Sequence, residues 1–223
     1  MGYGIALEVS GNYALFTRPE LRVERYTYDV ITPSAARGIL EAIFWKPGLR
    51  YVIDSIVVMN EIKTTNIRRN EVNSKISARD VAQVIKGKNE KLYLATSTDI
   101  AQRASVVLKD VRYVINAHFE LTDKAGESDT KEKFYNMLLR RTEKGQCFYN
   151  PYFGTKEFPV SFKLYKQAKD GEFYYYNKGE RDLGLMLYDM DYSDQQDIKP
   201  MYFRAMMENG VIITDPNKVE VLR

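Results

Sequence analysis

The sequence of 223 residues contains one cysteine, one histidine and no long apolar run. Cys147 alone can form no disulfide within the chain and no cysteine-based zinc site, so we expect a reducing compartment and no metal centre. No stretch approaches the roughly 20 apolar residues that a membrane helix needs, and the amino terminus leads into a strand pattern rather than a signal peptide. We therefore predict a cytoplasmic protein that needs no metal or other cofactor and has no membrane partner.

The composition is that of a folded globular protein, with 44% hydrophobic and 28% charged residues and a net charge of +3. The length fits one large domain or two small ones. The cations are clustered and interleaved with 17 tyrosines and 10 phenylalanines. Loops of this kind can neutralise phosphates and stack bases, which favours single-stranded nucleic acid as a partner. The alternative is that they are solvated loops between core aromatics. The clusters contain Arg18, Arg22 and Arg25; Lys63, Arg68, Arg69, Lys75 and Arg79; Lys86, Lys88 and Lys91; and Arg140, Arg141 and Lys144.

The single histidine, His118, lies in residues 110–121, where apolar and polar side chains alternate. This period of two is typical of a half-buried strand, and it places His118 on the open face with Arg112. Histidine has an unperturbed pKa of about 6.5, so it can give or take a proton near neutrality. Asp110 and Glu120 are candidates to orient its ring. The alternative is a surface histidine without a role.

A helix is predicted to begin at Thr32, a hydroxyl cap followed by proline, and to run to about residue 45. Its apolar stripe is Ala36, Ile39, Leu40 and Ile43, and Lys46-Pro47-Gly48 stops it. Helical spacing places Phe44 on the polar flank of this helix rather than in the core stripe.

Further elements follow in the order of an α+β protein. Strands are expected at 3–10, 51–59, 62–67, 92–94, 104–121 and 158–164, and helices at 80–86 and 130–144, the former within a polar loop over 73–91. Residues 62–67 should pair with 51–59 or continue it. The order strand, helix, two strands, helix, strand is that of a ferredoxin-like, RNA-recognition-like domain, in which helices cover one sheet face and leave the other free.

The chain changes character after residue 167, where short strand patterns recur without a helix signal. These patterns lie at 173–176, 183–192, 202–207 and 211–214. We therefore predict two parts: a ferredoxin-like domain over residues 1–167 and a small antiparallel β-sheet extension over residues 168–223.

Several longer segments are similar to one known family. They are Thr-Arg-Pro-Glu at 17–20, Ser-Ala-Ala-Arg-Gly-Ile-Leu-Glu-Ala-Ile-Phe-Trp-Lys-Pro at 34–47, Ile-Arg-Arg-Asn-Glu-Val at 67–72, Ala-His-Phe-Glu-Leu at 117–121, the Gly145 to Phe148 and Pro151 to Pro159 segments, and Asp-Leu-Gly-Leu-Met-Leu-Tyr-Asp at 182–189. Together they resemble the Cas-five subunit of type I-C CRISPR systems, nearly from end to end.

The resemblance implies an endoribonuclease that cuts CRISPR repeat transcripts. It implies metal-independent chemistry, in which a ribose 2′-hydroxyl attacks the adjacent phosphate and leaves a cyclic phosphate. It also implies that the protein stays on the 5′ handle of the CRISPR RNA, as a part of the surveillance complex with the other type I-C subunits.

The resemblance assigns the reaction to a tyrosine at the end of the first helix and to an adjacent lysine and histidine on a strand. His118 matches, but Phe44 stands in place of the tyrosine and Ala117 in place of the lysine. Losing a charge stabiliser typically costs roughly 10²–10³ in rate. Alternation points Ala117 away from His118 and into the core unless a bulge intervenes. Phe44 would then stack a base or simply pack. The candidates for the missing positive charge are Lys46, Arg37 and Arg112.

Phosphate contacts are assigned to arginines, since guanidinium stays charged and binds phosphate through two hydrogen bonds. Alternation points Arg68 and Arg69 in opposite directions, so one of them is expected to touch RNA. Arg18, Arg22 and Arg25 would bind RNA or a neighbouring subunit. Two main hypotheses follow: an endoribonuclease with His118 as general acid or base, and a non-catalytic subunit that grips the 5′ handle. A third is an assembly scaffold with little RNA affinity.

Overall fold

The computed structural model describes residues 3–21, 23–88, 92–166, 172–194 and 196–223. Arg22 and Lys91, two of the predicted cluster cations, lie outside the described residues. The elements are β1 (Gly4–Ala14), β2 (Arg25–Tyr26), α1 (Pro33–Ile43), β3 (Leu49–Val58), β4 (Lys63–Val72), α2 (Ala78–Ile85), β5 (Ile100–Leu121), α3 (Lys131–Glu143), β6 (Ser161–Leu164), β7 (Glu180–Asp191), β8 (Lys199–Glu208) and β9 (Val211–Ile213).

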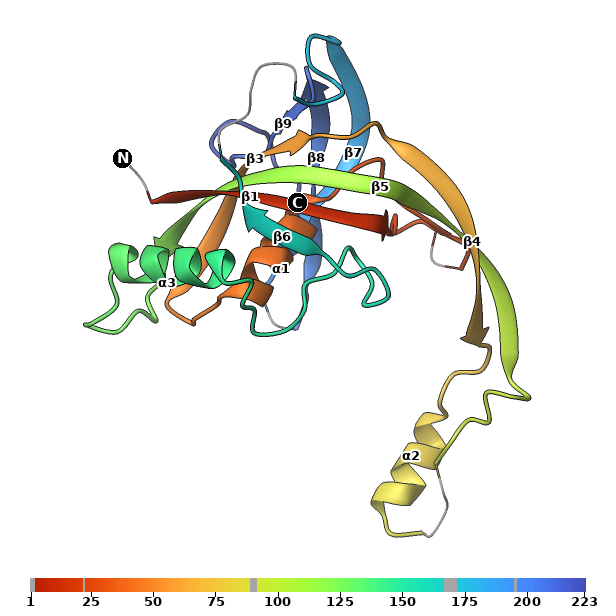
Figure 1. The fold of residues 1–223 in the computed structure, drawn as a ribbon. Helices are drawn as coiled ribbons and strands as arrows, with labels where there is room; N and C mark the ends of the chain where they lie inside the picture. The colour runs from red at the N-terminus through yellow and green to blue at the C-terminus, as the bar shows by residue number, and fades with distance from the viewer. Residues whose placement is uncertain (1–2, 22, 89–91, 167–171, 195) are drawn as a thin grey trace.

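A mostly antiparallel sheet organises the described part of the chain, which is therefore α+β as predicted. Its strands run in the order β6-β1-β5-β3-β9-β8-β7, with β2 and β4 added along β5. Strand β5 is 22 residues long and contains His118. Its second half lies between β1 and β3, whereas its first half pairs with β4 and β2. Figure 1 shows β5 crossing the molecule and continuing beyond the body.

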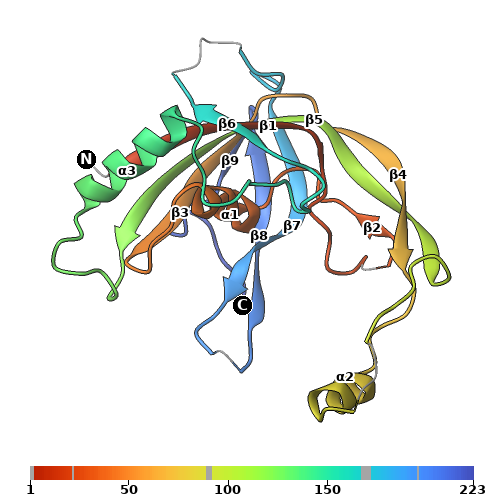
Figure 2. The same ribbon diagram turned by 60° about the horizontal axis from the view of Figure 1, so that its bottom comes forward.

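Helices α1 and α3 pack on one face of the sheet (Figure 2). The alternation in β5 explains the choice of face, because Val111, Tyr113, Ile115, Ala117 and Phe119 are all buried. They form one core with β1 and α1. The polar residues between them point to the opposite face. Within the described residues, no helix is both long and apolar enough to cross a membrane.

Helix α1 begins as predicted, because the hydroxyl oxygen of Thr32 accepts a hydrogen bond from the Ala35 amide and Pro33 occupies the first turn. It ends at Ile43, earlier than predicted. Phe44 has left the helix with extended backbone angles of φ −153° and ψ 123°. Its ring is only 1% exposed and packs against Phe134, with ring centroids 5.9 Å apart. The prediction of an exposed flank is wrong, since it assumed helical geometry at residue 44.

The first half of β5 and β4 form a two-stranded arm with α2 at its tip (Figure 1). Strand β4 follows β3 along the same side of β5, since β3 pairs with residues 113–121 of β5 and β4 with residues 100–109. Of the two predicted arrangements, β4 therefore continues the line of β3 and does not pair with it. Helix α2 lies close to the predicted helix at 80–86. Residues 92–94 form no strand. In residues 73–88, the described part of the predicted loop, α2 forms the exposed end of this arm.

The carboxy-terminal strands extend the sheet through β9, which pairs with Ser55–Val57 of β3. Met186 of β7 and Phe203 of β8 are fully buried and belong to the same core as the helices. The predicted strands at 183–192, 202–207 and 211–214 correspond to β7, β8 and β9. The expected strand at 173–176 is a turn instead.

Candidate active site

His118 lies on the sheet face opposite the helices, as the alternation predicted. It pairs with Gly4 of β1 on one side and with Val52 of β3 on the other. Its side chain is 33% exposed, whereas its neighbours Ala117 and Phe119 are buried beneath the helices. The ring is therefore fixed by two strands and still accessible to a substrate.

Asp54 holds the ring of His118, with Oδ1 at 2.6 Å from Nδ1. The register between β3 and β5 shifts between Ile53 and Ser55, so Asp54 sits at a bulge. The carbonyl oxygen of Asp54 accepts hydrogen bonds from the amides of Thr214 and Asp215 at 3.0 and 3.1 Å. A carboxylate can only accept, so Nδ1 of His118 donates and Nε2 is left to exchange protons.

Sequence reasoning missed Asp54 and suggested Asp110 and Glu120 instead. The signal was present, because Asp54 is the one charged residue in the apolar, β-branched run from 51 to 59. The pairing register that brings it to His118 depends on the bulge, and a bulge re-aims side chains without marking the sequence. The carbonyl of Asp110 instead accepts from Asn60.

Further ionisable groups surround the imidazole. A hydrogen bond from Arg50 lowers the pKa of the Glu120 carboxyl, and His118 adds a smaller effect in the same direction. The Asn217 amide lowers the pKa of Asp215, again with a contribution from His118. The face around His118 therefore holds several carboxylates that are ionised near neutral pH.

A groove of about 560 Å³ adjoins this cluster along the edge of β3. It exists because β9 pairs with β3 only over Ser55–Val57 and leaves the earlier part of that edge open. Val52, the residue opposite His118, contributes to its wall. Burial and the nearby Asp189 raise the pKa of Tyr188, another wall residue, to about 12, so its hydroxyl stays protonated. Three cations line the groove: Arg37, Arg50 and Arg223.

The structure places the other predicted catalytic residues away from His118. Phe44 is core and offers no ring face to a base. Ala117 is 2% exposed and faces the helices, as ideal alternation predicted. Lys46 is exposed in the turn after α1, where its charge contributes to a lowered pKa of Asp129 that comes chiefly from Lys133. The structure does not bring Lys46 to His118.

Two other candidates for the missing charge are already paired. Arg37 donates to Asp189 at 2.9 and 2.7 Å and to Glu41 at 2.6 Å, which ties α1 to β7. Arg112 shares the face of His118 and donates to Glu8 at 3.0 and 3.1 Å. It lies six residues along β5, about 20 Å at strand spacing. Neither guanidinium is placed beside the imidazole.

The arginines of the arm and the neighbouring loop differ in accessibility. Arg68 is exposed, and its side chain has no hydrogen bond or ion pair with another described residue. The side chain of Arg69, by contrast, is 13% exposed and donates a hydrogen bond to Glu157 at 2.8 Å. The predicted opposite orientation is confirmed. Arg25 contacts Glu71 at 3.4 Å, and Arg18 stacks over the Tyr28 ring at 4.7 Å. Arg68 is the one best placed to meet a phosphate.

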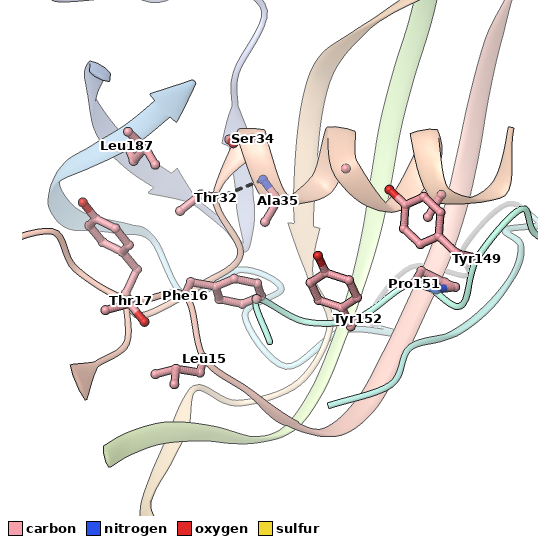
Figure 3. A pocket seen from close by; sticks show the side chains of 14 residues that line it. Leu15, Phe16, Thr17, Thr32, Ser34, Ala35, Tyr149, Pro151, Tyr152 and Leu187 are labelled. Carbon is pink, nitrogen blue, oxygen red and sulfur yellow. Dashed lines mark hydrogen bonds between the residues drawn. The ribbon is translucent and has the colours of Figure 1, made fainter. Parts of the chain in front are cut away.

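A separate pocket of about 320 Å³ lies between α1 and residues 149–154, on the helix side of the sheet (Figure 3). Phe16, Tyr149 and Tyr152 line it. None of the predicted catalytic or RNA-binding residues borders it. In the part of the chain that the structure describes, no three histidine, cysteine or acidic side chains gather closely enough to hold a metal ion.

Comparison with known proteins gives consistent results. The family model of CRISPR-associated protein (Cas_Cas5), type Cas5d, matches residues 4–215. A CRISPR pre-crRNA endoribonuclease Cas5d of Mannheimia succiniciproducens is 45% identical over 232 residues, covering 100% of both chains. Another of that name, from Thermus thermophilus, is 38% identical over 187 residues, covering 83% of this chain and 72% of the relative.

Two solved structures have the same fold. One is the crystal structure of a CRISPR-associated protein, with a TM-score of 0.69 and 23% identity, covering 99% of this chain and 96% of the other. The other is a functionally uncharacterized protein from Streptococcus mutans, also with a TM-score of 0.69 and 23% identity, covering 99% and 97%. With a family match over residues 4–215 and a full-length relative at 45% identity, the chain belongs to the Cas5 family of CRISPR-associated proteins, in its type I-C branch Cas5d.

Proposed function

We propose that the chain is an endoribonuclease that cuts CRISPR repeat RNA and then remains on the 5′ handle as a subunit of the type I-C surveillance complex. One observation carries the proposal: His118, one-third exposed and hydrogen-bonded to Asp54, lies on the open sheet face opposite Val52, which lines a groove that also contains Arg50. The names of the two relatives support the same activity. We also propose that it acts in the cytoplasm, where prokaryotic transcripts are made.

The proposed reaction needs only proton transfer and positioning. The ribose 2′-oxygen attacks the adjacent phosphorus, the bond from phosphorus to the 5′-oxygen breaks, and the products are a 2′,3′-cyclic phosphate and a 5′-hydroxyl. Nε2 of His118 takes the 2′-hydroxyl proton as general base or gives a proton to the leaving oxygen as general acid. Asp54 keeps the ring in the tautomer that this requires.

A second function, a non-catalytic subunit that binds the 5′ handle, is favoured by one specific observation. Phe44 and Ala117, which occupy the family positions of the tyrosine and lysine, are both buried and carry no polar side-chain atom. Of those three positions, only His118 can then act chemically. Binding without cutting needs none of them, because phosphate contacts come from exposed cations.

The two functions are separated by incubating the protein with its cognate repeat RNA in excess chelator, at protein excess over RNA. An endoribonuclease gives a fragment ending in a cyclic phosphate in a single turnover. A repeat made entirely of 2′-deoxynucleotides is the matched control and should stay intact. An uncut RNA repeat that is nevertheless tightly bound would establish the binding function instead.

We further propose that residues 1–167 form a ferredoxin-like domain that carries the reaction, with residues 168–223 as an antiparallel extension. The order β1, α1, β3, β5, α3, β6 and the sheet order β6-β1-β5-β3 support this division, since they follow the split βαβ plan. The open face of such a domain is where RNA-recognition domains bind their ligand. Because β9 pairs with β3 and Met186 and Phe203 belong to the shared core, we expect the two parts to unfold together, in a single urea transition. Two separate transitions would show that the extension folds independently.

A further inference from the structure

Arg50 is the cation that the sheet register brings to His118. In the antiparallel pair of β3 and β5, Arg50 lies directly opposite Glu120 and Val52 lies opposite His118. Arg50 and His118 are therefore diagonal neighbours on the same face, a separation of about 7–8 Å that long side chains bridge. Arg50 also lines the groove.

The carboxylates around His118 make this face negatively charged, so a phosphate needs a nearby cation in order to bind there. Asp54, Glu120 and Asp215 all lie around the imidazole. Arg50 also acts on this group, because it lowers the pKa of Glu120. Without a free positive charge, three carboxylates would repel the scissile phosphate, and more strongly so as negative charge builds up during the attack.

The exposure of the Arg50 side chain and its surface ion pair allow it to change partners. Its side chain is 67% exposed, and among the described residues its one ion pair is with the exposed Glu120. Ion pairs of this exposure contribute little free energy, so a phosphate can replace the carboxylate. Arg37, by contrast, is held by two carboxylates between α1 and β7. Guanidinium binds phosphate oxygens through two parallel hydrogen bonds.

We propose that Arg50 is a catalytic residue that leaves Glu120 to bind the scissile phosphate in the groove along β3, and that it supplies the positive charge absent at Ala117. This rests on the proposed endoribonuclease function. Glu120 then acts as the place-holder for the phosphate in the free protein. Protons still move through His118, and Arg50 stabilises the negative charge of the transition state.

The test compares single-turnover cleavage rates and RNA dissociation constants of wild type, Arg50→Ala, Arg50→Lys and Arg204→Ala. Arg204 of β8 is the matched control. It is an exposed arginine that forms an ion pair with Asp182 of β7 at 2.6 Å, and it does not line this groove. Arg50→Ala should cut about 10²–10³-fold more slowly, with affinity reduced less than about 10-fold. Arg50→Lys should be intermediate and Arg204→Ala unchanged.

The double variant Arg50→Ala/Glu120→Gln separates loss of the guanidinium from an unpaired carboxylate. It should stay as slow as Arg50→Ala; recovery of the wild-type rate would show that Glu120 had caused the defect and would overturn the proposal. An Arg50→Ala protein that cuts within about twofold of an active wild type also overturns it, and leaves the endoribonuclease function standing. A wild type that does not cut removes that function and the catalytic role of Arg50 together.

Discussion

The two halves of β5 differ, although they are one continuous strand. From Val111 to Leu121 the strand is covered by helices on one face and presents His118 on the other. From Ile100 to about Lys109 it runs out with β4 into the arm, towards α2, which has no buried residue. Asp110 marks the change, with a positive φ of 52°. In the covered half, packing holds His118 in a fixed position, as a reaction requires. In the other half, the strand extends away from the core, where its side chains can contact RNA that lies outside the body.

The arginines near the candidate site and the cations of the arm differ in whether they are ion-paired. In the body, Arg37, Arg50 and Arg112 are all ion-paired. On the arm, the cations that form no ion pair with another described residue are Arg68, Lys75, Arg79, Lys86, Lys88 and Lys109. Unpaired cations release counterions when they meet phosphates, so they contribute affinity that depends on salt. We therefore expect substitutions in the body to change cutting and folding, and substitutions on the arm to change binding.

The largest effect is expected for His118→Ala. It removes the proton-transfer group, so the single-turnover cleavage rate should fall by about 10²–10⁴-fold. RNA affinity should stay within a few-fold, since one imidazole adds little to an interface with many phosphates. Rates at saturating protein and filter-binding affinities measure the two quantities. Cleavage close to the wild-type rate would make the histidine a bystander.

Asp54→Asn should lower the cleavage rate by about 10–10²-fold, because an amide no longer holds the ring in one tautomer. The chain has one histidine, so ring-¹⁵N histidine labelling yields the signals of His118 alone. These signals should change in Asp54→Asn. Asp215→Asn is the matched control, since His118 contributes to the lowered pKa of Asp215 through charge and the two side chains share no hydrogen bond. Equal effects of the two variants would mean that only the local charge matters.

Glu8→Gln tests the ion pairs of the body. Burial opposes the charge of Glu8, but hydrogen bonds from Arg112 and Lys163 hold its pKa below the usual value of 4.5. A lowered pKa in the folded state means stability that is present above about pH 4.5 and lost as pH falls through the folded value. Glu8→Gln should cost about 1.5 kcal/mol at pH 7.

Urea unfolding at pH 7 and pH 3.5 measures this difference. Wild type should lose more stability than Glu8→Gln between the two values, because the variant has no carboxyl at residue 8 to protonate. If wild type and Glu8→Gln lose the same free energy of unfolding between the two pH values, the ion pairs of Glu8 with Arg112 and Lys163 contribute no stability.

The smallest effect is expected on the arm. Arg68→Ala should weaken RNA binding about 3–10-fold and reduce the slope of log K against log salt by about one, with an unchanged cleavage rate at saturation. Arg69→Ala is the internal comparison on the same strand: it removes the bond to Glu157, so it should lower stability as well. An Arg68→Ala variant that binds like wild type would contradict the proposed role of the arm.

Local patterns in the sequence predicted much of the body. Alternation placed His118 and Ala117 on opposite faces, and a hydroxyl followed by proline located the start of α1. Both signals act over a few residues, where backbone geometry decides. Phe44 was misplaced because one residue beyond the end of a helix no longer follows its period.

Long-range partners were not predictable in this way. Asp54 reaches His118 through a bulge, β4 pairs with β5 across the whole arm, and Arg37 meets Asp189, 152 residues away in sequence. These depend on register and packing between distant segments, which single-sequence patterns do not encode. The candidate site was therefore half predictable: the histidine was found, and its partners were not.

The shortness of β9 has a consequence for how copies of this chain behave together. Its three residues leave Leu49–Val52 without a second neighbouring strand in the part that the structure describes. An open strand edge invites strand addition from another molecule, and a charged side chain and a bulge are two ordinary safeguards against it. Arg50 is such a charge, and Asp54 lies at such a bulge. We therefore expect the arginine that is proposed to bind the scissile phosphate to disfavour strand addition at this edge as well.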